Sequence, residues 1–533
     1  MLKGTRILII SFIIFISMLN AFASDPPDWQ GGRPDGCTSV TVGKAASDGG
    51  WVATSHTCDS HRTRSWFDKQ PAKVYKKGER LQLVKRINND STAMPSYQKI
   101  PTGEIDQAER TFGFINTAYP CMNEHQLAIG ESTFGGRETL HSQKGLVDCQ
   151  QLVQLMLERC TTAREAIELA RDILAKYGWN DEGECLTIAD KTEVWHLEVV
   201  GPGAGHVGAV WVAQRVPDDE VSVNANASRI RRVDLSQPDY FMASDNYTQA
   251  ALDSSWWRPE DGPFEFCYAY DPGGRQSMAA RRREWRVFDL LAPSLKLQPN
   301  SENYPFSVKP DKPVSLADLV AVFRDYYEGT PFNFVKDITV TDDSGRTIIS
   351  PLANPFMPYD MNKVFRINGG WGWLGERTIA RWYTMYATIT QSRQALPDDI
   401  GGLVWMAMDN VASSIYVPIY CGVNDVAAPY KTPGRSNGFT RDSAWWAFNR
   451  LGTLTAQRWG DMRHDVAAVW HPWQEELFAN QAEVEEKALE LYQQNPQHAR
   501  QFLTDYGVTW GTKVVDKAWV LGDFLWTKYD EKF

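Results

Sequence analysis

Residue types that mark several protein classes are scarce or missing in this chain of 533 residues. It has no long run of Lys or Arg, and a net charge of −11 argues against nucleic-acid binding by phosphate neutralisation. Eight Cys are too few for a disulfide-stapled scaffold. The common zinc signatures C-x-x-C and H-E-x-x-H are both absent, and we expect no metal and no organic cofactor.

Long apolar runs are also rare, and the one that stands out lies at the start. Residues 7–24 carry no charge, follow Lys3 and Arg6, and reach a small-x-small end at Ala21–Ala23. This arrangement predicts a secretory signal over residues 1–23, with an uncleaved membrane anchor as the alternative. Because no comparable segment follows, we expect an exported protein, periplasmic or secreted, without stable membrane insertion after signal removal.

What the sequence does contain is the mixture of a folded globular protein. Hydrophobic residues make up 43% and charged residues 23%, and the length allows one large or two fused domains. Residues 24–36, by contrast, are rich in Pro, Gly and Asp, which predicts a leader or propeptide. The 21 Trp allow a rival interpretation, a glycan-binding surface, although Trp is highly buried on average.

Alternating and β-branched residues predict strands in the first two thirds of the chain. We expect them at residues 37–42, 51–55, 126–130, 194–200 and 209–215. Gly203, Gly205 and Gly208 match G-x-G-x-x-G. A dinucleotide site needs a helix after these glycines, and because a strand follows here, we expect a hairpin.

Helical signals come in two places. Thr162 and Glu165 form a capping box, and the apolar stripe after them stops near Gly178. The last third of the chain is expected to be mostly helical, with helical spacing at residues 475–494, 496–506 and 513–528. Strands followed by helices, without regular alternation, predict an α+β fold.

Two motifs suggest chemistry but have the wrong surroundings. Ser436 lies in G-x-S-x-G, yet the segment before it predicts a loop instead of the buried strand that a nucleophile elbow needs. His56, Cys58, Asp59 and His61 are clustered, but their spacing fits no standard zinc pattern. We therefore expect a turn at Ser436 and no metal at the cluster.

Cys37 is more informative because it directly follows Gly36, between the leader and the first strand. Cleavage there would give an N-terminal residue with a thiol and a free α-amine, whose pKa of about 7.7–8.0 suits a base near neutral pH. The thiol is a strong nucleophile once deprotonated. From the residues alone, Cys37 is such a nucleophile, an ordinary buried or disulfide-bonded cysteine, or a lipidation site.

Several ordered segments resemble the cysteine dipeptidases of peptidase family C69, which are N-terminal nucleophile hydrolases related to penicillin V acylase and bile salt hydrolase. The resemblance covers most of residues 37–533 and is weaker toward the C-terminus. The similar segments begin at Cys37 and at Ser55 and continue at residues 122–133, 184–198, 210–217 and 224–230.

This resemblance implies a four-layer αββα sandwich of the N-terminal nucleophile hydrolase type. Residues 37–350 would form the hydrolase core, and residues 351–533 a mainly helical C-terminal portion of the same catalytic unit. Self-cleavage between Gly36 and Cys37 would expose Cys37. Its thiol would then attack the scissile carbonyl and form a thioester that water hydrolyses.

The resemblance also implies further site residues. Asp59 takes the place of an acid beside the terminal amine, where it accepts hydrogen bonds. Asn123 and Asn226 match positions that hold the substrate or donate to the oxyanion. From the residues alone, these two are a turn-former and a loop cap. Arg283 matches a distal active-site arginine.

The chain departs from the family pattern at His56, where many relatives carry an arginine three residues before the acid. Arg62 and Arg64 are candidates for the missing cation. Together with His56 and Arg283 they form the expected substrate-binding set.

These features predict an exported cysteine-type dipeptidase or exopeptidase that hydrolyses short peptides. One alternative is an amidase for N-acyl amino acids or bile-salt-like conjugates, and the other is the non-catalytic glycan-binding protein. Side-chain preference and oligomeric state, a homo-oligomer included, stay open.

Overall fold

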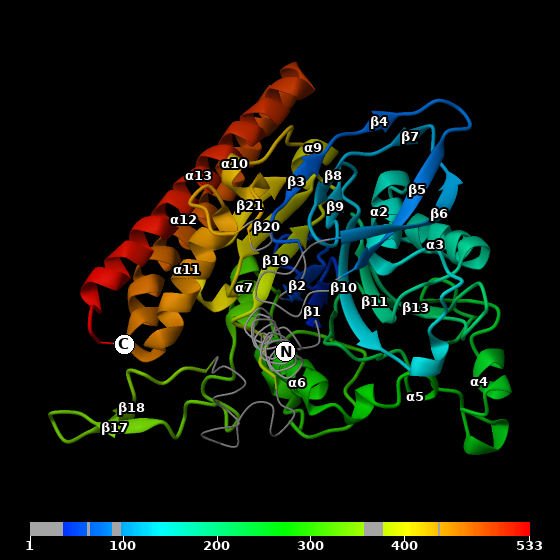
Figure 1. Ribbon diagram of the computed structural model, residues 1–533, viewed down its shortest axis with the longest axis horizontal. Helices are drawn as coiled ribbons and strands as arrows, with labels where there is room; N and C mark the ends of the chain where they lie inside the picture. The colour runs from blue at the N-terminus through cyan, green and yellow to red at the C-terminus, as the bar shows by residue number, and fades with distance from the viewer. Residues whose placement is uncertain (1–35, 61–63, 88–97, 356–376, 435–437, 533) are drawn as a thin grey trace, which may run out of the picture.

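The computed structural model describes residues 36–60, 64–87, 98–355, 377–434 and 438–532 (Figure 1). The predicted signal peptide lies outside these described residues, and so does the predicted leader apart from Gly36. Three further residues named above also lie outside them: His61, Arg62 and Ser436. Helices and strands are both abundant, which confirms the predicted α+β class. None of the helices that the structure describes is long and apolar enough to cross a membrane.

Two antiparallel sheets form the centre of the molecule. The first has seven strands in the order β16-β14-β1-β2-β19-β20-β21, and the second has eight in the order β15-β13-β12-β11-β10-β9-β8-β3. The strands of the first sheet are β1 (Gly36–Val42), β2 (Ser55–Asp59), β14 (Val221–Asn224), β16 (Ser307–Val308), β19 (Thr384–Gln391), β20 (Leu403–Met408) and β21 (Val417–Tyr420). Those of the second are β3 (Asp68–Gln70), β8 (Phe114–Asn116), β9 (Met122–Asn123), β10 (Ala128–Gly135), β11 (Gly183–Ala189), β12 (Val194–Val200), β13 (Val210–Val216) and β15 (Phe241–Ala243).

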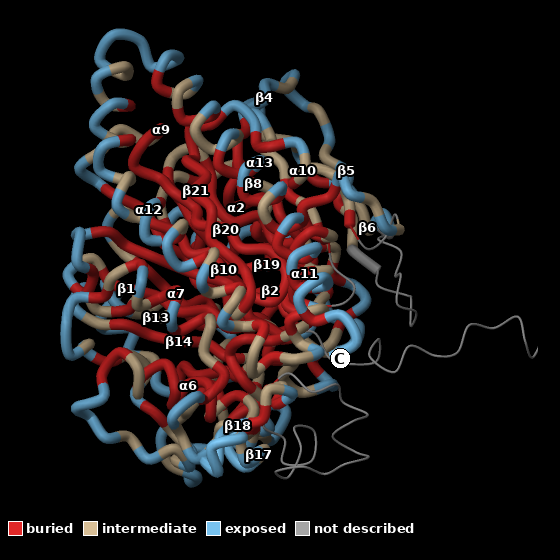
Figure 2. Tube along the Cα trace, turned by 90° about the vertical axis from the view of Figure 1, so that its left-hand side faces the viewer, coloured by how far each residue is buried: buried red, intermediate tan, exposed pale blue. Residues whose placement is uncertain are grey.

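The two sheets contact each other where β10 meets β1 and β2. Ser39 Oγ on β1 donates to the carbonyl oxygen of Glu131 on β10 at 2.8 Å. Gly130 permits this close approach, since a Cβ at this position would lie 2.5 Å from the carbonyl oxygen of Ser55. The first residues of β1 are thereby fixed against the second sheet. Figure 2 shows that central strands such as β1, β2, β10 and β19 lie in the buried interior.

Helices flank both sheets (Figure 1). The second sheet is covered by α2 (Cys149–Arg159) and α3 (Ala163–Tyr177), whereas α6 (Met278–Leu291) packs against β14 of the first. The C-terminal helices α11 (Ala444–Gln457), α12 (Trp459–Gln494) and α13 (Pro496–Lys528) pack on one another and reach β20 and β21. Shorter helices are α4 (Gln249–Asp253), α5 (Phe266–Tyr270), α7 (Leu316–Arg324), α9 (Asp398–Gly401) and α10 (Ala428–Lys431). Peripheral strand pairs are β4 (Lys73–Val74) with β7 (Arg110–Thr111), β5 (Arg80–Ile87) with β6 (Gln98–Asp106), and β17 (Thr339–Thr341) with β18 (Thr347–Ile349).

Two local predictions are confirmed. The capping box at the start of α3 is present: Thr162 Oγ1 accepts from the Glu165 N–H, and the Glu165 carboxylate accepts from the Thr162 N–H, each at 3.2 Å. The helix stops at Gly178, which adopts a φ of 73°. The G-x-G-x-x-G glycines lie in the turn that joins β12 to β13, so the hairpin is confirmed.

The C-terminal portion differs from expectation in two respects. The described residues from 377 onward are mainly helical, but they also supply β19, β20 and β21 to the first sheet. The sequence predicts a break near Gly507 and Gly511, whereas α13 runs through both. A Cβ on Gly511 would come within 3.0 Å of the Ala427 Cβ, so this glycine serves close packing instead of ending the helix.

Candidate active site

Cys37 lies at the start of β1 and is only 3% exposed. Its backbone N–H donates to Asn226 Oδ1 at 3.1 Å, and its thiol donates to Glu131 Oε1 at 3.2 Å. Burial, reinforced by the Glu131 carboxylate, raises the pKa of the Cys37 thiol well above its usual value. In the chain that still carries Gly36, the thiol therefore keeps its proton.

Asp59 closes β2 and lies opposite Gly36 in the strand pair. Thr384 Oγ1 on β19 donates to Asp59 Oδ1 at 2.6 Å, and the Arg377 guanidinium donates to Asp59 Oδ2. Both partners come from far along the chain, yet the sheet order places β19 directly beside β2. The predicted acid is thus held next to the junction between Gly36 and Cys37.

Asn226 follows β14 with a backbone φ of 61°, a left-handed conformation that Asn tolerates better than most residues. Its Oδ1 accepts from Cys37 N, from Arg283 Nη2 at 2.9 Å and from Arg377 Nη1 at 3.1 Å. Its Nδ2 donates to the Thr133 carbonyl at 2.7 Å. Asn226 therefore holds the Cys37 nitrogen as an acceptor, and one of its two amide N–H donors is bonded to Thr133.

Arg283, on α6, joins the same cluster. Its Nη1 donates to the Cys37 carbonyl at 2.6 Å and to Thr38 Oγ1 at 2.9 Å, while Nη2 also donates to the Ala225 carbonyl at 2.8 Å. Burial, with the nearby positive charge of Arg377, lowers the pKa of Arg283 to about 9. Arg283 thus fixes the backbone on both sides of the Cys37–Asn226 contact.

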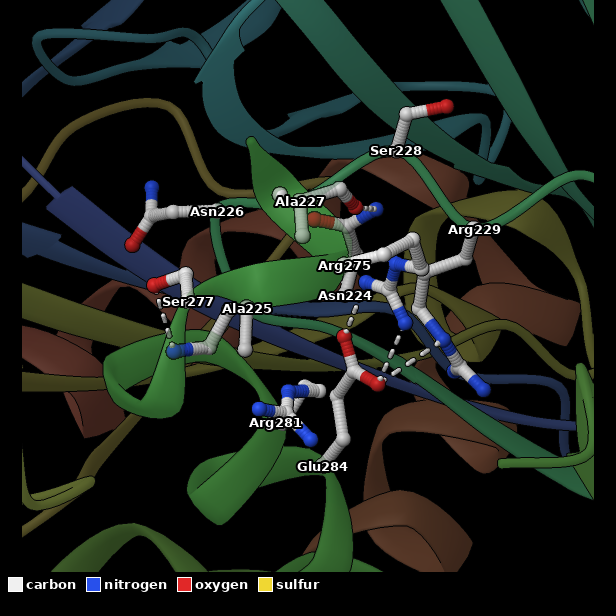
Figure 3. Close-up of polar contacts among 12 residues, drawn as sticks. Asn224, Ala225, Asn226, Ala227, Ser228, Arg229, Arg275, Ser277, Arg281 and Glu284 are labelled. Carbon is white, nitrogen blue, oxygen red and sulfur yellow. Dashed lines mark hydrogen bonds and ion pairs between the residues drawn. The ribbon is translucent and has the colours of Figure 1, made fainter. Parts of the chain in front are cut away.

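A buried ion cluster supports the segment that carries Asn226 (Figure 3). Glu284, next to Arg283 on α6, accepts from Arg275 Nη1 at 3.1 Å and Nη2 at 2.7 Å, and Arg229 Nε lies 3.5 Å from Glu284 Oε2. Burial alone would raise the pKa of Glu284, but the charges of Arg275 and Arg229 outweigh it and lower the pKa. The cluster ties α6 to the chain that follows Asn226.

His56 lies near the thiol rather than at the acid. Its Nε2 is 3.6 Å from Glu131 Oε2, and its ring makes edge contacts with Tyr119 and Tyr386, each with a centroid separation of 5.6 Å. Burial lowers the pKa of His56 to about 3, so the imidazole is neutral near pH 7. The cation expected near this position is supplied instead by Arg377.

The remaining predicted residues are placed elsewhere. Asn123 is a correction: its Nδ2 donates to the carbonyls of Leu157 and Cys160, each at 2.8 Å, and its Oδ1 accepts from His125 N and Leu127 N, each at 3.0 Å. These four bonds fix the turn before β10 and leave Asn123 without a free donor for an oxyanion.

Arg64 is the second correction. Its guanidinium pairs with Asp68 and donates to the Trp66 carbonyl at 3.0 Å, so the described contacts do not make it the cation at Asp59. Arg62, the other candidate, lies outside the described residues. The suspected metal cluster is divided, because Asp59 pairs with Arg377 while His56 approaches Glu131.

Sequence reasoning missed Arg377 and Glu131. Glu131 had a usable signal, namely an acidic residue within the otherwise uncharged strand β10. Arg377 had none, because it lies 318 residues from Asp59 and only the sheet topology brings the two together. All eight cysteines lie among the described residues, are buried and form no disulfide, so Cys37 is not held in one.

Comparisons with known proteins agree with the resemblance seen in the sequence. The chain is similar to a probable dipeptidase of Latilactobacillus sakei, with 25% identity over 439 residues that cover 80% of this chain and 82% of that protein. A probable dipeptidase B of Lactococcus lactis subsp. lactis (strain IL1403) is 23% identical over 480 residues, or 87% of this chain and 92% of the relative. A probable dipeptidase of Salmonella dublin is 26% identical over 407 residues, or 74% and 82%. Because the family model described as Peptidase family C69 matches residues 36–472, the chain belongs to that family and is a peptidase.

Proposed function

We propose that the protein is an exported cysteine-type dipeptidase that hydrolyses short peptides with Cys37 as its N-terminal nucleophile. The observation that carries this proposal is the convergence of Asn226 and Arg283 on Cys37, with Asp59 opposite Gly36, at the first residues matched by the family model. The names of the relatives, probable dipeptidases, support the substrate class. The two facing sheets with helices on their outer sides support a four-layer αββα N-terminal nucleophile hydrolase sandwich.

Removal of the leader is the first step of this proposal. While Gly36 is attached, the Cys37 nitrogen is a peptide nitrogen and cannot act as a base, so Glu131 is the group that takes the thiol proton. The sulfur attacks the Gly36 carbonyl carbon, the bond from Gly36 to the Cys37 nitrogen breaks, and Glu131 returns the proton to that nitrogen. Water then hydrolyses the thioester and frees Cys37.

In the mature enzyme the freed amine can serve as the base. Asn226 Oδ1 accepts from this nitrogen, and Asp59 lies opposite Gly36, so the amine is oriented toward its own thiol. The thiolate attacks the scissile carbonyl of the dipeptide and the amine proton passes to the leaving amine. Water hydrolyses the resulting thioester and restores Cys37.

Replacement of the nucleophile tests the mechanism. Cys37→Ala should lower the rate on a dipeptide panel by at least about 1,000-fold, because nothing else forms the thioester. Cys160→Ala is the matched control, since Cys160 is also buried and makes no contact with the Cys37 cluster in the described structure; it should keep most of the activity. Full activity of a folded Cys37→Ala protein would refute the mechanism.

Substrate class needs a separate comparison. The same machinery could cleave N-acyl amino acids or bile-salt-like conjugates, so kcat/KM should be measured for dipeptides and for these amides side by side. We expect dipeptides to be the faster substrates. Faster cleavage of the acyl conjugates would overturn the dipeptidase assignment and leave the Cys37 mechanism intact.

A further inference from the structure

The Cys37 thiol lies close to two side chains of different chemistry, an imidazole and a carboxylate. Cys37 Sγ, a ring nitrogen of His56 and a carboxylate oxygen of Glu131 all lie within 4.8 Å of one another. The residues come from β1, β2 and β10, so both sheets contribute to the group. Their exposed fractions are 3%, 1% and 1%, which places three potential metal ligands in a site shielded from bulk water.

The separations suit a small divalent ion. Tetrahedral zinc with Zn–S of about 2.3 Å and Zn–N or Zn–O of about 2.0–2.2 Å places its sulfur about 3.5–3.7 Å from a nitrogen or oxygen ligand, and nitrogen and oxygen ligands about 3.3–3.6 Å apart. Here Cys37 Sγ is 3.2 Å from Glu131 Oε1, and His56 Nε2 is 3.6 Å from the other oxygen, Glu131 Oε2. The side chains therefore have to shift by a few tenths of an ångström to bind one ion. Thiolate, imidazole and carboxylate are also the three ligand types that zinc takes in proteins.

His56 provides an independent sign of a ligand. Its Nε2 is buried and has no hydrogen-bond partner among the described residues, although it is directed toward Glu131. A buried polar atom without a partner costs free energy, and a metal ion would satisfy it. The edge contacts with Tyr119 and Tyr386 hold the ring in this orientation.

We propose that Cys37, His56 and Glu131 form a reversible inhibitory site for Zn²⁺. The Cys37 thiol releases its proton to the solvent as the Zn–S bond forms, and water takes the fourth coordination position. The sulfur lone pair is then held by the metal and cannot attack a carbonyl. Metal binding itself does not depend on the proposed function. The inhibition of peptide hydrolysis by the metal does rest on it.

Cobalt provides the direct test because a Co²⁺–thiolate bond absorbs light and needs no substrate. Titration of the metal-free protein with Co²⁺ should give one thiolate-to-cobalt band per chain, which Zn²⁺ abolishes. His56→Asn and Glu131→Gln should each weaken Zn²⁺ binding at least about 10-fold, since even outer partners of a metal ligand are worth 10–100-fold. His206→Asn, in the hairpin turn outside the site, is the matched control and should bind Zn²⁺ like the unaltered protein.

Three results would overturn the inference. Absence of the cobalt band in the unaltered protein excludes a thiolate–metal bond, whatever the variants do. Unchanged Zn²⁺ affinity in folded His56→Asn, or in folded Glu131→Gln whose N-terminus has been checked by intact mass, means that these two side chains do not hold the metal. Cys37→Ser, close in volume to the native residue, should abolish the band, and a retained band would also contradict the site.

The rate measurement separates this inference from the proposed function. Zn²⁺ should inhibit dipeptide hydrolysis with the affinity seen in the cobalt competition, and a chelator should restore the full rate without any metal being added back. A cobalt band in a protein that hydrolyses no peptide supports the metal site and contradicts the dipeptidase. Cys37-dependent hydrolysis without a cobalt band supports the dipeptidase and contradicts the metal site.

Discussion

At the scale of single residues, the pair of Arg377 and Asp59 joins two distant parts of the chain beside Cys37. Their side chains are 12% and 0% exposed, so removal of the arginine leaves a buried carboxylate without its cation. Arg377→Met should lower the free energy of unfolding by about 3–5 kcal/mol in urea titration and should reduce kcat.

Two comparisons sharpen this prediction. The double variant Arg377→Met/Asp59→Asn should lose less stability than the sum of the single variants, because neither charge is then left alone. Arg346→Met removes an exposed ion pair with Asp342 and should cost less than about 1 kcal/mol. If Arg377→Met lowers the free energy of unfolding no more than Arg346→Met does, the buried ion pair is not a major source of stability.

Asn226 combines an unusual backbone conformation with a functional side chain. Both Asn226→Gly and Asn226→Ala remove the Oδ1 acceptor and should abolish most activity. Only Ala is strained at a φ of 61°, so it should be about 1 kcal/mol less stable than the Gly variant in urea unfolding. Equal stability of the two variants would contradict the left-handed conformation.

At the scale of elements, α13 offers a matched pair of glycines. A Cβ on Gly507 would make an ordinary contact, 3.5 Å from the Pro418 carbonyl oxygen, whereas a Cβ on Gly511 would meet Ala427 at 3.0 Å. Gly507→Ala should therefore raise stability by about 1 kcal/mol through helix propensity alone. In Gly511→Ala, overpacking against Ala427 should cancel this gain, so its melting temperature should be lower than that of Gly507→Ala. A higher melting temperature for Gly511→Ala would contradict the helix packing.

Elements with local signals were predictable from the sequence, and those set by distant contacts were not. The capping box of Thr162 and Glu165 fixes the start of α3 from four neighbouring residues. The hairpin of β12 and β13 was evident from its alternating strands. By contrast, β19 belongs to the first sheet only because it pairs with β2, more than three hundred residues earlier.

The candidate site follows the same division. Cys37, Asp59, Asn226 and Arg283 were expected from the family resemblance, and the structure brings them together. Asn123 was misassigned because a buried Asn in a motif serves equally well to fix a turn, and sequence alone does not separate the two roles.

At the scale of the whole molecule, two buried titratable groups make the free energy of unfolding depend on pH in opposite directions. Burial lowers the pKa of His196 to about 3, so its contribution is present above the unfolded pKa of about 6.5 and is lost as pH falls toward 3. Burial raises the pKa of Asp271 to about 7, so its contribution is present below the unfolded pKa and is lost as pH rises through 7.

The two groups can be separated by substitution. The quantity to compare is the loss in free energy of unfolding when the pH is lowered from 7 to 5. His196→Asn should make this loss about 2 kcal/mol smaller than in the unaltered protein, and Asp271→Asn should make it larger by a similar amount. Urea unfolding at the two pH values measures both. Shifts of the same sign in the two variants would contradict the assigned protonation states.

The central claim is that Cys37 works as a freed N-terminal nucleophile. Intact mass and N-terminal sequencing of the purified, peptide-hydrolysing protein test it most directly. The account predicts that the active chain begins at Cys37, after Gly36 has been removed. An active chain in which Gly36 still precedes Cys37 would contradict it, since the amine held by Asn226 would then be a peptide nitrogen.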